Sequence, residues 1–114
     1  MSWQSELVCW VLRRWTRPET AKPGIDATRA RAITSKRVWS PKVPAGWHLV
    51  ERYGEHDAPL RGEWLTSEKP SEITILYLHG GGYYFCSPAT HRGIVFPFAR
   101  RSGARTFSLD YRLT

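Results

Sequence analysis

The sequence lacks the patterns that identify a disulfide-rich, zinc-binding or membrane-spanning protein. Its two cysteines, Cys9 and Cys86, form no CxxC pair, so we expect no disulfide framework. The longest apolar run near the start, LVCWVL at residues 7–12, is too short to span a bilayer, and no small-residue cleavage site follows it. Zinc-ligand spacing such as HExxH is missing among the histidines. The four are His48, His56, His79 and His91. We therefore expect a cytoplasmic protein without a zinc site.

Basic residues are in excess but are not concentrated in one place. The chain has 17 Lys and Arg residues against 10 Asp and Glu, a formal charge of +7 and a pI near 9.9. Such a balance fits nucleic acid or an anionic membrane as a partner. However, the basic doublets Arg13-Arg14, Lys36-Arg37 and Arg100-Arg101 lie far apart, and no nucleic-acid-binding motif occurs. We interpret the charge as a solvated surface and predict no nucleic-acid partner.

Phosphate-binding glycine motifs are missing too, although the chain carries three consecutive glycines in ILYLHGGGYYFCSP at residues 75–88. No Lys follows them as in GxxxxGK[ST], and Gly82 is followed by YYFC, which excludes GxGxxG. Ligands of parallel α/β sheets bind at the carboxyl ends of the strands. Glycines there also let backbone N–H groups face an oxyanion, which needs donors about 3 Å away. The residues therefore favour an oxyanion loop.

The first part of the chain is predicted to be helical. Residues 2–15 place Trp3, Leu7, Trp10 and Val11 on one helical face. We interpret that face as core packing in preference to a membrane-surface helix. A second helix is expected at 26–36, DATRARAITSK, with Asp26 as its cap, followed by a linker that contains two prolines and a glycine.

From residue 47 the pattern changes to extended. The near-continuous apolar run ITILYLH is typical of a central strand that is covered on both faces. Ser87 and Pro88 suit the N-cap and first position of a helix in which Pro97 should cause a kink or an early end. Gly103 suits its C-terminus. The expected elements are strands at 47–53 and 60–66 in a hairpin, a strand at 73–79, a helix at 89–103 and a strand at 104–112. The last three make a right-handed, parallel βαβ unit.

Two segments together carry a family resemblance. YLHGGGYYFCSPATHR followed by GARTFSLDYRL resembles the hormone-sensitive-lipase branch of the α/β-hydrolases, which includes the bacterial family IV esterases. The resemblance implies an α/β fold: the N-terminal portion of an α/β-hydrolase sheet, about four strands, with N-terminal cap helices. Residues 1–40 would be the helical cap segment, and 41–114 an incomplete hydrolase core carrying the HGGG oxyanion loop. It implies no metal and no organic cofactor.

The resemblance also implies roles for the loop residues. The backbone N–H groups of Gly81 and Gly82 would be the oxyanion donors, with Gly80 shaping the turn. His79 would hold the loop by hydrogen bonding and would not be the catalytic base. The tyrosines that follow, Tyr83 and Tyr84, would lie near the acyl pocket.

Two departures from the family pattern matter. Members usually carry Gly where this chain has Cys86, which would be strained if the position needs a positive φ; we interpret its thiol as packed and unreactive. The GxSxG nucleophile is missing, since none of the late serines has that context, and so are the triad acid and histidine. Among these serines are Ser67, Ser87, Ser102 and Ser108. Asp110 resembles a structural residue, and His91 is interpreted as a solvent-facing helix residue.

The preferred hypothesis is the N-terminal part of a carboxylic ester hydrolase, through truncation or an interrupted gene, which acts on acyl esters when a C-terminal half completes it. One alternative is a non-catalytic module that binds an anionic or carbonyl ligand; another is a basic interaction protein. In the family's strand order, ITILYL pairs with the Phe107-containing strand and lacks its other neighbour. We expect this exposed apolar edge to cause self-association or poor solubility.

Overall fold

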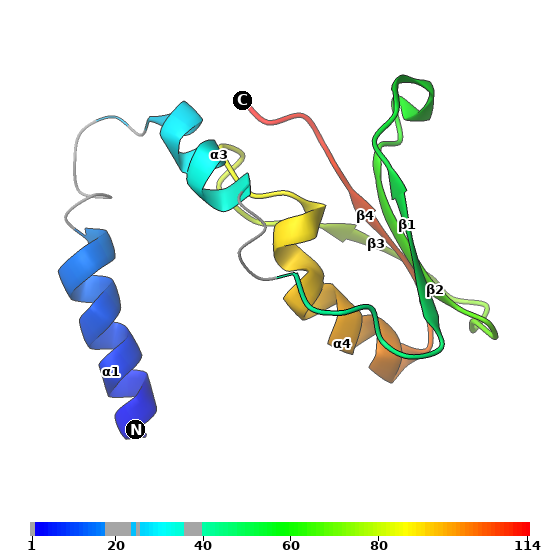
Figure 1. Ribbon diagram of the computed structural model, residues 1–114, viewed down its shortest axis with the longest axis horizontal. Coiled ribbons are helices and arrows are strands. Elements are labelled where there is room, and N and C mark those ends of the chain that lie inside the picture. Colours follow the sequence, from blue (N-terminus) through cyan, green and yellow to red (C-terminus); the bar gives the residue numbers. More distant parts are fainter. Residues whose placement is uncertain (1, 18–23, 25, 36–39) are drawn as a thin grey trace.

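The computed structural model describes residues 2–17, 24, 26–35 and 40–114, and it has a helical N-terminal part followed by a mixed sheet (Figure 1). The helices are α1 (Trp3–Val11), continued by a π-helical turn (Leu12–Thr16), α3 (Ala27–Ser35) and α4 (Arg92–Ser102). Short 3₁₀ turns occupy Glu55–Asp57 and Pro88–His91. The strands are β1 (Trp47–Arg52), β2 (Gly62–Ser67), β3 (Thr74–Leu78) and β4 (Arg105–Leu109).

The four strands form one sheet in the order β1-β2-β4-β3. The β1–β2 and β2–β4 pairs are antiparallel, whereas β3 and β4 are parallel. The predicted hairpin and the predicted strand–helix–strand unit are therefore confirmed. The register places Trp64 beside Phe107, and Leu76 on the other side of Phe107. β3 pairs only with β4 among the described strands, so it forms an edge of the sheet as the family's strand order predicts.

The hydrophobic core lies between one face of the sheet and α4. Leu65 of β2 packs with three side chains of α4, and Trp47, Leu49 and Tyr77 are partly buried against them. The α4 residues are Val95, Phe96 and Ala99. These positions are one turn apart or less, so the helix presents a single apolar stripe to the sheet.

The start and end of α4 follow the predicted signals with two differences. Ser87 and Pro88 open a 3₁₀ turn, and the α-helix begins only at Arg92. Gly103 ends the helix in a left-handed conformation at φ 67°, as expected from the C-cap preference. The helix continues through Pro97 to Ser102, so the predicted early end at that proline is wrong.

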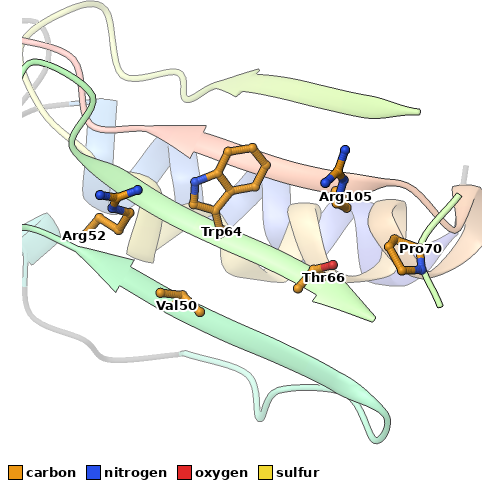
Figure 2. Close-up of a pocket in the computed structure, with 6 residues that line it drawn as sticks. All are labelled: Val50, Arg52, Trp64, Thr66, Pro70 and Arg105. Carbon is orange, nitrogen blue, oxygen red and sulfur yellow. The ribbon is translucent and has the colours of Figure 1, made fainter. Parts of the chain in front are cut away.

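The opposite face of the sheet is largely uncovered. Trp64 and Phe107 pack ring against ring there, with centroids 4.8 Å apart. Leu76 and Leu78 of β3 are 60% and 58% exposed. A shallow hollow of about 470 Å³ lies on this face, between the apolar side chains and two arginines (Figure 2). The expectation that β3 is covered on both faces is therefore wrong for the described part of the chain, because α4 covers one face alone.

A buried ionic network connects α4 to the hairpin. Arg92 donates from Nε to Glu63 Oε2 at 2.9 Å and from Nη2 to Glu63 Oε1 at 2.6 Å, and both side chains are more than nine-tenths buried. The guanidinium also contacts Glu51 and donates to Ser40 Oγ at 2.9 Å. Tyr53 donates its hydroxyl to Glu63 Oε1 at 2.7 Å, and burial followed by that hydrogen bond raises the pKa of the phenol. The network gives the buried carboxylate three donors.

The first helix does not pack as predicted. Ser2 accepts from the Ser5 amide as an N-cap, but every residue of α1 is exposed, including Trp3 at 72% and Trp10 at 60%. Its apolar face therefore has no cover within the part of the chain that the structure describes. None of the described helices is long and apolar enough to cross a membrane. In α3, by contrast, Asp26 accepts from the Arg29 amide at 3.0 Å, which confirms the predicted cap.

Candidate functional site

The glycine loop follows the carboxyl end of β3 and leads into the 3₁₀ turn before α4 (Figure 1). At its start, His79 is 4% exposed and its ring stacks on Tyr111 with centroids 4.3 Å apart. The His79 Nδ1 atom lies 2.8 Å from the Gly80 carbonyl oxygen, which requires Nδ1 to carry the proton. The Tyr111 hydroxyl donates to the His79 carbonyl, and burial raises the pKa of that phenol, so it remains a donor. These contacts fix the base of the loop.

One of the three glycines is sterically required. Gly81 has φ 126°, and a Cβ there would lie 2.1 Å from the Phe85 carbonyl oxygen. The Gly81 carbonyl in turn accepts from the amides of Tyr84 and Phe85 at 3.1 and 3.3 Å. Gly82 has φ 60° but its Cβ would meet only a ring carbon at 4.0 Å, and a Cβ at Gly80 would be 3.8 Å from its nearest neighbour. The tight turn therefore depends on Gly81 in particular.

The amides of the second and third glycines make no hydrogen bond among the described residues. Neither the N–H of Gly81 nor that of Gly82 donates to a group of the residues that the structure describes. Gly82 is exposed and Gly81 half-buried. Two adjacent free amides on a closed turn are the donor type that binds carboxylates and oxyanions.

Two residues after the glycines have an unfavourable backbone conformation. Tyr83 has φ 65° and Cys86 has φ 73°, both in the left-handed region that L-residues other than Gly, Asn and Asp seldom adopt. The positive φ that would make Cys86 strained is thus observed, and such residues cost about 1–3 kcal/mol each. The side chains of Tyr83 and Tyr84 are exposed and do not line the hollow shown in Figure 2.

The chain is similar in sequence to known hydrolases and esterases. The sequence model of a family described as having the alpha/beta hydrolase fold matches residues 75–114. An acetyl-hydrolase of Streptomyces hygroscopicus is 38% identical over 50 residues, which are 44% of this chain and 17% of that protein. An acetyl esterase of Salmonella typhi is 25% identical over 97 residues, 85% of this chain and 30% of that protein.

Solved structures superpose over nearly the whole chain. A hormone-sensitive lipase from a metagenome library has a TM-score of 0.66 at 28% identity, covering 87% of this chain and 32% of its own. A mutant of the esterase E40 has a TM-score of 0.67 at 30% identity, covering 99% and 37%. The chain thus resembles the hormone-sensitive-lipase family and has the fold of the N-terminal portion of an α/β-hydrolase. It spans less than two-fifths of the length of these relatives.

Sequence reasoning misplaced one residue beside the loop. His91 is half-buried, and its ring lies 5.6 Å from that of His79 and 6.0 Å from that of Tyr77, measured between centroids. The solvent-facing interpretation of His91 is therefore wrong. Burial lowers its pKa, a hydrogen bond with the backbone of Ser87 opposes that shift, and His79 lowers it further. The ring of His91, with its pKa lowered by burial, thus lies beside that of His79 at the start of the loop.

Sequence reasoning also missed the residues that hold the outer part of the loop. Arg31 of α3 donates from Nε to the Tyr84 carbonyl at 2.7 Å. The two residues are 53 positions apart in the sequence, so no local sequence motif could predict this contact. Among the described residues, no three His, Cys, Asp or Glu side chains lie close enough together to hold a metal ion.

Proposed function

We propose that this chain carries the oxyanion loop of a carboxylic ester hydrolase, with the N–H groups of Gly81 and Gly82 as the donors. The observation that supports the proposal is the pair of free glycine amides on a loop fixed by the buried His79. When a nucleophile adds to an ester carbonyl, negative charge develops on the carbonyl oxygen, and preoriented donors stabilise it without reorganising. The Gly80 carbonyl, occupied by His79, supports the turn and takes no part in the chemistry.

The proposed substrates are small acyl esters. Two relatives have the names acetyl-hydrolase and acetyl esterase, and we extend the acetyl-ester class to the hydrolase that contains these 114 residues. A serine nucleophile, its base and its acid have no counterpart in this sequence, so other residues of the hydrolase fold must supply them. The proposed reaction needs no metal and no organic cofactor. Residues 1–40 would cover the site, and 41–114 would carry its loop.

The open edge of β3 supports a further part of the proposal. Its unpaired backbone and the exposed Leu76 and Leu78 form a surface on which another strand can pair. We assign that edge to a neighbouring strand of the completed hydrolase fold. Without that strand, the edge leads to self-association.

The test begins with the native gene product, purified from its source. Its intact mass is compared with 13.1 kDa, and its hydrolysis of p-nitrophenyl acetate is measured for the unmodified protein, Gly81→Ala and Gly80→Ala. We expect Gly81→Ala to lower kcat about 100-fold or more, because the loop that carries both donors cannot close around a Cβ. Gly80→Ala has room for its methyl group and should stay within a few-fold. Equal kcat for all three proteins would contradict the proposal.

A non-catalytic binding function is the second candidate, and the presence of the two free amides without a nucleophile in these residues favours it. It predicts a native product of 13.1 kDa that binds acetate saturably and hydrolyses no ester. A heavier product with esterase activity would exclude it.

A further inference from the structure

We propose that Arg31 of α3 is a positioning residue that holds the glycine loop in its ligand-binding conformation. The inference rests on the proposed function, because it assigns a role to the N-terminal helical segment in shaping the oxyanion donors. Arg31 is half-buried, on the face of α3 that meets residues 83–86.

The loop needs an external restraint. Tyr83 and Cys86 both occupy the left-handed region without the freedom of glycine. Such conformations persist only where surrounding contacts determine them. The hydrogen bonds of His79 and Tyr111 lie at the start of the loop, and Tyr111 meets Tyr83 through an edge-to-face contact of the rings, with centroids 6.2 Å apart. The backbone of the second half of the turn is therefore held by other groups.

Arg31 is placed to do so through two main-chain oxygens. Its Nε donates to the Tyr84 carbonyl at 2.7 Å, and its Nη2 donates to the main-chain oxygen of Thr114. Thr114 in turn donates from both its amide and its hydroxyl to the Tyr83 carbonyl, each at 3.0 Å. The rigid, planar fork of a guanidinium fixes the relative position of two acceptors, which a single ammonium cannot do. The loop, Arg31 and the segment after β4 are thereby connected.

A second contact comes from the same helix face. Thr34, three residues after Arg31, accepts from the Cys86 amide at 3.4 Å, and its own hydroxyl donates to the Ala30 carbonyl at 2.9 Å. Cys86 is one of the two strained positions. α3 therefore touches the loop at Tyr84 and at Cys86, on both sides of Phe85.

The restraint acts on the glycine amides through the turn. The amides of Tyr84 and Phe85 donate to the Gly81 carbonyl, so the position of the Tyr84 peptide sets that of Gly81. If Arg31 releases the Tyr84 carbonyl, Tyr83 can leave its strained conformation and the turn no longer holds the peptides of Gly81 and Gly82 in place. The N-terminal segment then regulates the donors without touching the ligand.

Amide hydrogen exchange of the full chain tests this role, read residue by residue by mass spectrometry at low micromolar concentration. The variants are Arg31→Gln, Arg31→Lys and the control Arg29→Gln, which changes an exposed arginine of the same helix. We expect Arg31→Gln to speed exchange at the Tyr84 and Phe85 amides about tenfold or more, with β1–β2 amides unchanged. Arg31→Lys should give a smaller increase, and Arg29→Gln none.

Unchanged exchange at Tyr84 and Phe85 in Arg31→Gln would overturn the proposal. So would equal acceleration in the β1–β2 hairpin, because Arg31 would then act on the whole fold; Arg31→Lys repeats the comparison if Arg31→Gln does not fold. The same measurement with added acetate separates the two proposals. If acetate slows exchange at neither Gly81 nor Gly82 in the unmodified chain, the oxyanion function fails, while a specific effect of Arg31→Gln still establishes the positioning role.

Discussion

Removing the guanidinium of Arg92 should be among the most destabilising single changes in this chain. Arg92→Met keeps the length of the side chain and its packing in α4 but leaves the Glu63 carboxylate, 3% exposed, without its two strongest donors. The Tyr53 hydroxyl then remains as its one donor among those described. Breaking a buried pair in this way costs about 3–5 kcal/mol, because an uncompensated charge stays buried.

That cost is large against the 5–15 kcal/mol that folded domains have in total. For a domain of this size it corresponds to a fall in Tm on the order of 15 °C. We would measure it by circular dichroism during thermal unfolding at low micromolar concentration. The control is Arg52→Gln, which breaks the 2.9 Å pair with Asp57 at an exposed turn. We expect that change to leave Tm nearly unaltered, because exposed ion pairs contribute little.

A second variant separates the loss of a charge partner from the loss of packing. In the double variant Arg92→Met with Glu63→Gln, no charge is buried, and the amide oxygen still accepts from Tyr53. We expect it to be more stable than Arg92→Met alone and to recover at least half of the lost Tm, since a neutral replacement of a buried pair is often well tolerated. A double variant that is less stable than Arg92→Met, or a single variant that loses less than about 1 kcal/mol, would refute this account of the network.

Three further outcomes follow from the loop and the sheet edge. Gly81→Ala should speed proteolysis within the loop while Gly80→Ala does not, as limited proteolysis followed by mass spectrometry will show, because a Cβ at Gly81 meets a carbonyl oxygen 2.1 Å away. We expect the unmodified protein to self-associate, and replacing Leu76 and Leu78 by Lys should make it monomeric in sedimentation experiments. An unmodified protein that is monodisperse and melts cooperatively would contradict the exposed-edge argument. Burial lowers the pKa of His91 below its ordinary 6.5, so the unfolded state takes up its proton first. Stability should be complete above pH 6.5 and fall as the pH drops toward the lowered value, and His91→Gln should flatten that decline in urea unfolding.

The local elements of this fold could be predicted because each has its own signal within a few residues. Asp26 caps α3, Gly103 ends α4, and the extended runs on either side of the turn at residues 55–57 pair as a hairpin. The parallel pairing of β3 and β4 follows from the helix between them. In each case the decisive residues are neighbours in sequence, so propensity and spacing are sufficient.

The long-range contacts of the fold and of the site could not be predicted because they join residues far apart in the chain. In the sequence, Arg92 does not differ from the arginines expected at the surface. In the fold, β1 and β2 bring Glu51 and Glu63 against it. His91 reads as a helix residue facing solvent until the turn carries its ring over His79. Whether a face of the sheet is covered likewise depends on which segment packs against it, and composition alone does not show this.

The residues in the left-handed conformation depend both on local sequence preferences and on long-range contacts. Local rules place glycine at such positions, and the chain follows them at Gly81 and Gly82 but not at Tyr83 and Cys86. A strained residue survives when the free energy of its tertiary contacts exceeds the cost of the conformation. Here those contacts come from α3 and from the segment after β4, which lie 53 and 31 residues away along the chain. At two of its left-handed positions, the loop therefore has the glycine that local rules require. At the other two, hydrogen bonds from distant parts of the chain hold the backbone in place.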